Sequence, residues 1–402
     1  MNRRLIAALA AVLAVTAAPA GAQPAGSNCR NTQDYGAWLA AFKQEALAKG
    51  VSPRAWTAAA PQLVFTPGII SRDRGQRFFA QDFTAFAGKM LMPYRLQKGP
   101  QLIRQHAALF QRIEREFGVP APVLVGFWGL ESDFGAGMGK LPVLPSLATL
   151  AYDCRRPDMF RPELLDALRL IDRGDLTPQE MIGSWAGELG QTQFLPTLYY
   201  KYGLDYDGDG RRDLIRSVPD VLASTANYLR DLGWRRGEPW LQEVRVPAEL
   251  PWDQADLEIQ HPRAQWARWG VTKPDGSPLE GDNRRASLLL PMGRNGPAFL
   301  AFDNFKIYTT WNNSLVYATT AAYYATRLAG APAMRKGNGP VASFSREQLM
   351  DLQRRLTRRG HNVGAVDGIL GAQTRAAIKV EQMKLGLPAD SYPSPDLFER
   401  LR

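Results

Sequence analysis

One glutamate stands out because of the residues that precede it. Residues 123–130 are continuously apolar, with a length that fits a buried helix, and Glu131 follows them just before the glycine-rich run Phe134–Gly139. A carboxyl group that emerges from an apolar wall loses hydration, which raises its pKa toward the range useful to a general acid at neutral pH. Glu131 is therefore the candidate catalytic acid, although its position alone also fits a helix-end glutamate that faces solvent. Asp133 lies roughly 200° further around a helix and is expected to be structural.

A second run of acidic residues indicates a cation site. Asp205, Asp207 and Asp209 alternate before Gly210, as at the start of a calcium-binding loop, and Arg211 could offer a backbone carbonyl. The position that normally supplies a bidentate glutamate holds Arg216. Weak calcium or sodium binding and a metal-free turn both remain open. Such an ion would be structural, and no cofactor is required for chemistry at Glu131.

Other enzyme signatures are missing from the sequence. It contains no GxSxG, HExxH, GxxxxGK or GxGxxG motif, and its three histidines are scattered. Each of these signatures places a nucleophile, a metal or a phosphate at a fixed spacing. Their absence weighs against redox, nucleotide-binding and metallopeptidase functions.

The elements that must position these residues are mostly helices. Aromatic residues recur at helical spacing between residues 34 and 115, whereas prolines interrupt short alternating stretches over residues 237–300. We therefore expect a mainly α fold with a small proline-rich, β-containing insertion. Helical sequence resumes at 314–328, residues 331–342 are expected to form a flexible linker, and a compact unit of three helices follows.

The N-terminus predicts export. Arg3 and Arg4 precede a short apolar stretch and a small-residue cleavage site, so residues 1–22 are interpreted as a secretory signal and not as a membrane span. Cleavage removes two arginines and no acid from a chain of net charge +10, which leaves +8. In an oxidising compartment Cys29 and Cys154 are expected to pair, with two free thiols as the alternative. The predictions are a periplasmic protein without a lipid anchor, a wall polymer or a membrane surface as its anionic partner, and no nucleic acid.

Blocks dispersed over about residues 35–330 resemble the lytic murein transglycosylase B family. They are Gly126–Gly135, Met138–Gly139, Ser146–Leu150, Ser184–Gly187, Gly190–Phe194 with Pro196, Ala226–Leu229 and Gly233–Trp234. The resemblance implies a lysozyme-like helical catalytic domain over residues 23–330. It also implies cleavage of the β-1,4 bond between N-acetylmuramic acid and N-acetylglucosamine in peptidoglycan. One glutamate, at the position of Glu131, would act as acid and then as base, leaving 1,6-anhydromuramoyl ends. A hydrolytic muramidase and a non-catalytic wall-binding protein are the alternatives.

The same resemblance assigns roles to further residues. It implies that Ser184 lies beside the catalytic carboxyl group and that Gln193 contacts sugar. Glu188 replaces a small residue of the family pattern, and its orientation is left open. An acid late in the metal loop, here Asp220, would close that site. Further residues that the resemblance places in the substrate cleft are Arg155, Arg156, Trp311 and Asn312, with Trp311 standing where the family usually has tyrosine.

The tail, residues 343–402, resembles three-helix peptidoglycan-binding domains. The resemblance rests on Leu349, Leu352, Gln353 and Leu356, on the turn Val366–Gly371, and on Thr374, Ala377 and Ile378. About sixty residues make only a small core, which favours a binding accessory over a second catalyst. We expect the whole chain to be a monomer that binds glycan strands.

Overall fold

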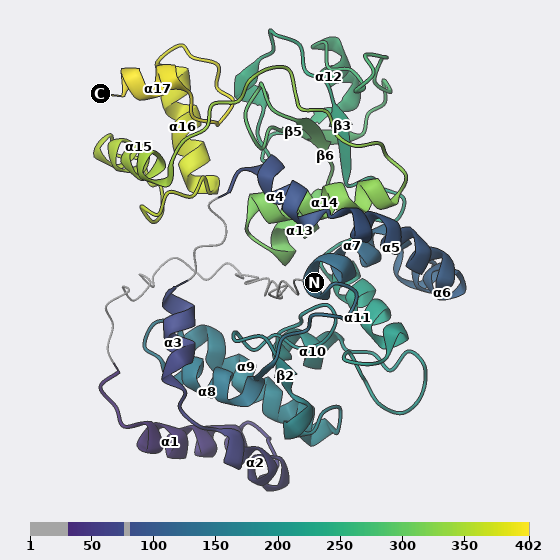
Figure 1. Cartoon of the computed structure of the whole chain (residues 1–402), viewed down its shortest axis with the longest axis vertical. Helices are drawn as coiled ribbons and strands as arrows, with labels where there is room; N and C mark the ends of the chain where they lie inside the picture. Colours follow the sequence, from purple (N-terminus) through teal and green to yellow (C-terminus); the bar gives the residue numbers. More distant parts are fainter. Residues whose placement is uncertain (1–30, 76–80, 402) are drawn as a thin grey trace, which may run out of the picture. The chain divides into compact units, whose positions relative to one another are not determined.

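The computed structural model describes residues 31–75 and 81–401 and divides the chain into two compact units (Figure 1). The first comprises the described residues up to 75 together with residues 99–232, and the second comprises residues 81–98 and 233–401. The predicted signal segment 1–22 and Cys29 lie outside the described residues. No helix in the described part of the chain is long and apolar enough to cross a membrane.

Within its described residues, the first unit is mostly helical and contains a small β ladder. Helices α8, α9 and α10 pack together, and α11 packs on α6 and α7. The two-residue strands β1 and β2 pair antiparallel, Leu141 opposite Gly183. The elements are α1 (Tyr35–Ala48), α2 (Pro53–Ala59), α3 (Pro67–Arg74), α6 (Ala107–Phe117), α7 (Ala121–Ser132), β1 (Leu141–Pro142), α8 (Val143–Tyr152), α9 (Pro157–Arg173), β2 (Ile182–Gly183), α10 (Pro196–Tyr202) and α11 (Val218–Asp231).

The second unit contains an antiparallel sheet in the proline-rich region, in the strand order β3-β6-β5-β4. Val244, Trp266 and Leu300 belong to the buried cluster at this sheet. Helix α14 packs on α4 and on β3. The elements are α4 (Phe83–Met90), β3 (Leu241–Val244), β4 (His261–Pro262), α12 (Arg263–Arg268), β5 (Arg285–Leu289), β6 (Ala298–Ala301), α13 (Phe305–Trp311) and α14 (Leu315–Leu328), while α5 (Pro93–Gln105) crosses the boundary between the units. The expected mainly α fold with a small β insertion is confirmed.

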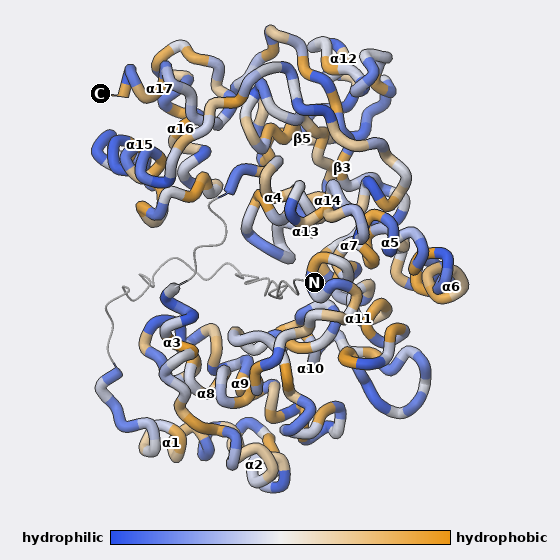
Figure 2. Tube along the Cα trace, viewed as in Figure 1, coloured by the Kyte–Doolittle hydropathy of each residue, from blue (hydrophilic) through white to orange (hydrophobic). Residues whose placement is uncertain are grey.

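Three helices form the tail, as predicted. They are α15 (Arg346–Arg358), α16 (Ala372–Lys384) and α17 (Pro395–Arg400). Ser345 and Gln348 form the expected capping box at the start of α15. Leu352, Leu356 and Ile378 belong to a separate small core. Figure 2 shows that α15 is mostly hydrophilic, which fits a helix that buries only one face.

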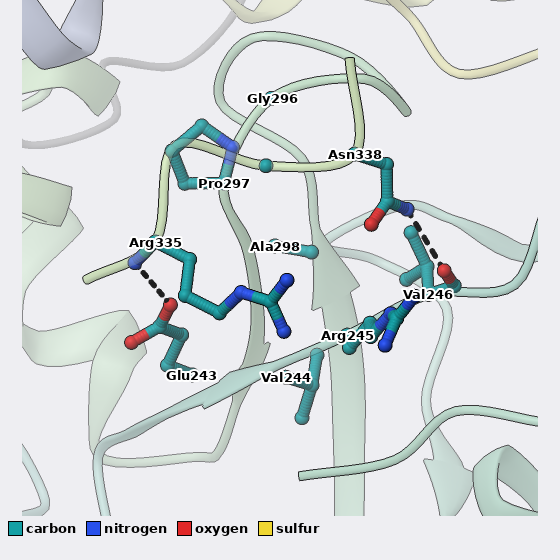
Figure 3. Close-up of a pocket in the computed structure, with 10 residues that line it drawn as sticks. Glu243, Val244, Arg245, Val246, Gly296, Pro297, Ala298, Arg335 and Asn338 are labelled. Carbon is teal, nitrogen blue, oxygen red and sulfur yellow. Dashed lines mark hydrogen bonds between the residues drawn. The ribbon is translucent and has the colours of Figure 1, made fainter. Parts of the chain in front are cut away.

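The segment 331–342 is fastened to the second unit and does not form the free tether expected from its composition. The backbone N–H of Arg335 donates to Glu243 (2.7 Å), and the Asn338 amide donates to the carbonyl oxygen of Val246 (2.8 Å). These residues line a small pocket beside β3 and β6 (Figure 3). The backbone of Asn338 also donates to the carbonyl oxygen of Asn295 (2.9 Å). Glycine and proline content alone did not reveal these partners because they lie about 45 to 90 residues away in sequence.

The tail also packs against the sheet region of the same unit. The guanidinium group of Arg375 donates to the backbone carbonyl oxygens of Pro291 (2.6 Å) and Leu290 (3.4 Å). Lys379 forms an ion pair with Asp256 (2.8 Å). Charged groups of α16 are therefore used to hold the tail in place.

Candidate active site

Helix α7 delivers Glu131 to a buried position. The apolar sequence before Glu131 forms a helix buried on every side, and Glu131 itself is 2% exposed in the last turn. Asp133 is the C-cap, with a left-handed backbone (φ 56°), and its N–H donates to the carbonyl oxygen of Gly129. A solvent-facing glutamate at a helix end is thereby excluded. Asp133 has the structural place expected of it.

The turn that follows β2 is organised by Ser184. Its hydroxyl oxygen accepts hydrogen bonds from the backbone N–H groups of Ala186 (3.1 Å) and Glu188 (3.2 Å). Its own N–H donates to the carbonyl oxygen of Glu188 (3.0 Å). Gly187 has φ +95°, and a Cβ there would come within 2.3 Å of Leu147, so the turn requires glycine. The serine predicted to lie beside the catalytic carboxyl group thus also fixes the loop.

Side chains of α7 bind this loop to the helix that carries Glu131. The indole N–H of Trp128 donates to the side-chain oxygen of Gln191 (2.7 Å), and the Ser132 hydroxyl donates to the Gln191 backbone carbonyl. Both donors come from the last turns of α7, which also hold Glu131. Sequence reasoning did not single out Gln191. Its polar side chain two residues before Gln193, in a run with no charged residue, is the signal that could have drawn attention to it.

Gln193 has a left-handed backbone conformation, which is strained for a residue other than glycine. Its φ is +51°, a conformation that costs on the order of 1 kcal/mol for a residue other than glycine. The amide group donates to the carbonyl oxygens of Gly190 (2.8 Å) and Met138 (3.3 Å). Within the described residues, its side-chain oxygen accepts no hydrogen bond and is available to a sugar hydroxyl.

Glu188 faces inward, which answers the question that the sequence left open. Its side chain is 4% exposed, and burial raises its pKa well above the ordinary value. A hydrogen bond with Ser184 opposes that shift, whereas the neighbouring charge of Glu131 adds to it. Two buried carboxyl groups, Glu131 and Glu188, are therefore found in the first unit.

Arg155 and Arg156 converge on a single buried carboxylate. Asp73 of α3 is 2% exposed and forms ion pairs with both guanidinium groups. Arg74 pairs in turn with Asp153 (3.1 Å). Within the described residues, Arg155 and Arg156 share the one carboxylate of Asp73. The sequence pointed to the arginines but not to Asp73, since the partner lies 82 residues away from Arg155.

Trp311 and Asn312 lie in the second unit, at the end of α13. Trp311 is half-buried, and Asn312 is 2% exposed. The side-chain oxygen of Asn312 accepts the backbone N–H of Ser314 (2.9 Å), just before α14 begins. Asn312 therefore has a structural role at this junction, and contact of either residue with sugar stays a prediction.

The acidic loop gathers three carboxylates. Side-chain oxygens of Asp205, Asp207 and Asp209 lie within 4.8 Å of one another, an all-oxygen set that suits calcium. The structure does not bring Asp220 into this group. Its buried carboxylate instead accepts backbone N–H groups of the loop, from Tyr206 (2.7 Å), Asp207 (3.3 Å) and Asp213 (2.8 Å). The Arg211 side chain reaches away to the Asp175 carbonyl oxygen (2.8 Å) and to Glu180 (3.0 Å).

Cys154 is disulfide-bonded. The other cysteine of the sequence is Cys29, which lies outside the described residues. The backbone N–H of Cys154 donates to the side chain of Asn31 (2.8 Å), so the start of the described chain contacts this region.

The chain belongs to the family with a transglycosylase SLT domain, whose model matches residues 34–326. Residues 345–401 match a peptidoglycan binding domain.

A curated relative is also named as a lytic transglycosylase. The chain is 32% identical over 232 residues to the membrane-bound lytic murein transglycosylase B of Escherichia coli, a match that covers 57% of this chain and 63% of that protein. It therefore spans less than two thirds of the length of that relative.

Solved structures extend the comparison. SltB3 from Pseudomonas aeruginosa, in complex with NAG-anhNAM-pentapeptide, is 42% identical, has a TM-score of 0.85 and covers 92% of this chain and 100% of its own. The Escherichia coli lytic transglycosylase Slt35, in complex with calcium, is 28% identical, has a TM-score of 0.61 and covers 72% of this chain and 92% of its own.

Proposed function

We propose that the chain is a peptidoglycan lytic transglycosylase that cleaves the β-1,4 bond between N-acetylmuramic acid and N-acetylglucosamine. Glu131 donates its proton to the glycosidic oxygen as the C1–O bond breaks. The muramoyl C6 oxygen then attacks C1, and its proton returns to Glu131. The product is a 1,6-anhydromuramoyl end, and no water is consumed. The burial of Glu131 at the end of an apolar helix carries this proposal, because a desolvated carboxyl group can keep a proton for donation.

The remaining assignments are also proposals. Ser184 and Gln193 would position the glycan in the first unit, and the excess charge of Arg155 and Arg156 over Asp73 would attract muramoyl or peptide carboxylates. Trp311 and Asn312 would contact sugar as well. The tail would hold wall polymer, and the enzyme would act in the periplasm, where the predicted export signal would deliver it.

We also propose a structural calcium ion at Asp205, Asp207 and Asp209. These three carboxylates converge, and no lysine or arginine in the described part of the chain forms an ion pair with them, which supports a hard cation there. The ion would neutralise repulsion among the carboxylates and stabilise the loop. The chemistry at Glu131 does not depend on it.

A variant of the proposed acid tests the enzymatic function. Glu131→Gln should abolish lysis of purified sacculi, with a loss of at least about a hundredfold, because the amide cannot donate the required proton. Mass spectrometry of wild-type digests should show anhydromuramoyl ends.

The control is Glu163→Gln, which changes another buried carboxyl group, on α9. This variant should lyse sacculi at the wild-type rate. Wild-type products with only reducing ends would show a muramidase, and equal lysis by Glu131→Gln would rule out Glu131 as the acid. Binding of sacculi without lysis by the wild type would favour a non-catalytic wall protein.

A further inference from the structure

Gln191 joins three segments of the first unit, although the proposed reaction gives it no part. Its side-chain oxygen accepts the indole N–H of Trp128 on α7 (2.7 Å), and its side-chain nitrogen donates to the carbonyl oxygen of Ile215 (2.9 Å). Its backbone N–H donates to the carbonyl oxygen of Leu214 (2.9 Å), and its backbone carbonyl accepts the hydroxyl of Ser132. Each of these four polar groups of Gln191 therefore bonds to a segment other than its own.

The surroundings of Gln191 are shaped to receive its amide group. The residue is 7% exposed, and Trp128 is 3% exposed. Gly135, in the turn that follows α7, has φ +84°, and a Cβ there would lie 2.7 Å from the side-chain oxygen of Gln191. At this depth water cannot easily replace a missing partner. Loss of the amide would thus leave the indole N–H and the Ile215 carbonyl without the hydrogen bonds they now make to it.

The bonds of Gln191 connect the two parts of the proposed site. Trp128 and Ser132 belong to the last turns of α7, and Glu131 lies between them in sequence. Gln193, which is proposed to contact sugar, follows Gln191 by two residues. The turn that carries the proposed acid and the loop that carries Gln193 are therefore fastened together at Gln191.

We propose that Gln191 is a positioning residue that holds the carboxyl group of Glu131 at the correct distance from the sugar bound at the loop of Gln193. It acts through Trp128 and Ser132 and needs no contact with substrate. The inference rests on the proposed function, since it concerns the acid of that reaction. It goes beyond that function because it gives Gln191 a part in the chemical step.

The reason is that proton transfer depends on one short distance. The acid must come within about 2.6–3.2 Å of the glycosidic oxygen. A misplacement of about 1 Å can slow such a step on the order of a hundredfold. Glycan binding, in contrast, is spread over several contacts. Loss of the Gln191 amide should therefore lower kcat much more than it raises KM.

The test is the variant Gln191→Met, which keeps the length of the side chain and removes both of its hydrogen bonds. The kinetics should be measured as anhydro-product formation from a soluble chain of alternating N-acetylglucosamine and N-acetylmuramic acid of defined length. Urea unfolding gives the folded fraction, so that kcat is expressed per folded molecule. We expect kcat to fall at least about tenfold and KM to stay within about threefold of the wild type. An unchanged kcat, or a change confined to KM, would overturn the proposal.

Asn304→Leu is the matched control. Asn304 is a fully buried amide in the second unit that also bridges backbone groups. It accepts the N–H of Arg235 (2.8 Å) and donates to the carbonyl oxygens of Arg235 (2.9 Å) and Glu238 (2.8 Å). Its folded fraction should keep the wild-type kcat. If this variant lost as much kcat as Gln191→Met, the loss would be a general effect of removing a buried amide, and Gln191 would have no special role.

A double-mutant cycle tests whether Gln191 acts through Trp128. Trp128→Phe removes the indole N–H that Gln191 accepts. If the two residues act as a unit, the double variant with Gln191→Met should lose much less kcat than the product of the two single losses. Losses that multiply fully would show that Gln191 acts independently of Trp128, which would contradict the proposal.

A further measurement does not depend on activity. In nitrogen-15 NMR spectra of the full chain, the indole N–H signal of Trp128 can be assigned by its disappearance in Trp128→Phe. In Gln191→Met this signal should move upfield, and its hydrogen should exchange faster with solvent. An unchanged signal would overturn the proposal. Absence of anhydro product from the wild type would instead refute the proposed function, while the indole signal would still show whether Gln191 and Trp128 are bonded.

Discussion

At the scale of single residues, this protein keeps several carboxyl groups away from water. Glu163 shows the effect outside the catalytic region. Burial raises its pKa to about 7, while hydrogen bonds with Thr197 oppose the shift and the charge of Asp166 adds to it. Below the ordinary pKa, Glu163 is protonated in both the folded and the unfolded chain. As pH rises toward 7, only the unfolded chain can ionise freely, so the folded state loses stability.

We therefore expect the free energy of unfolding of the first unit to fall between pH 5 and pH 8. Glu163 should contribute on the order of 2 to 3 kcal/mol to that fall. In Glu163→Gln this contribution disappears. The free energy of unfolding of the variant should therefore increase relative to that of the wild type as pH rises. Urea unfolding of both proteins at pH 5 and pH 8 measures this difference. If the stability of wild type and variant fell equally with pH, the raised pKa assigned to Glu163 would be contradicted.

The sequence predicted single residues well where the signal was local. An apolar run directly before Glu131 indicated a buried acid, and the structure places it there. The inward turn of Glu188 was not predictable, because it depends on the hydrogen bond of its backbone to Ser184 and on the packing that buries its side chain. Asp73 escaped notice for the same reason, since only the packing of α3 brings it to Arg155 and Arg156.

At the scale of elements, the segment that follows α7 and the strand β2 come into close backbone contact. Gly139 has φ +91°, and a Cβ there would lie 2.1 Å from the carbonyl oxygen of Gly183, so the two segments meet as bare backbone. Helix boundaries were predictable from caps and periodicity, as at Ser345 in the tail. The position of the Asp220 side chain was not predictable from the sequence. Its carboxylate oxygens accept backbone N–H groups of the loop and do not join the cluster of Asp205, Asp207 and Asp209.

The acidic loop gives a prediction at this scale. Calcium at about a hundred times its dissociation constant should stabilise the folded chain by about 2.7 kcal/mol and raise the melting temperature by roughly 5 °C or more. The reason is that the ion binds three carboxylates that otherwise repel one another. Calorimetry with calcium after chelator treatment measures the effect.

Magnesium at the same concentration serves as the salt control and should give a smaller shift. The double variant Asp205→Asn, Asp209→Asn should not respond to calcium. An identical response of wild type and variant would show that calcium acts elsewhere.

At the scale of the whole molecule, the strand region, the segment 331–342 and the tail of the second unit are joined by more hydrogen bonds than the composition indicated. The hydrogen bonds from Arg335 and Asn338 fix the segment 331–342 on the strand region, and Arg375 fixes the tail. The sequence predicted three helices and a separate small core there. It did not predict these attachments, which need partners distant in sequence.

Proteolysis tests the attachment. Cleavage after Arg335 or Lys336 requires the segment to leave the surface, so trypsin should cut folded wild type slowly. The double variant Glu243→Ala, Asn338→Ala removes two hydrogen bonds worth about 1 kcal/mol each and should be cut at least about tenfold faster. Asn313→Ala, an exposed asparagine outside the segment, is the control. Equal cleavage rates in all three proteins would show that the segment is a free tether.

The hydrogen bonds of Arg375 limit how the C-terminal module can be exchanged between proteins. Its guanidinium group donates hydrogen bonds to two carbonyl groups, at Leu290 and Pro291, that belong to the preceding region. A wall-binding module taken from an unrelated protein would not bring this arginine. A chimera joined in the 331–342 segment would then lose those two bonds and would have to be redesigned on both sides of the junction.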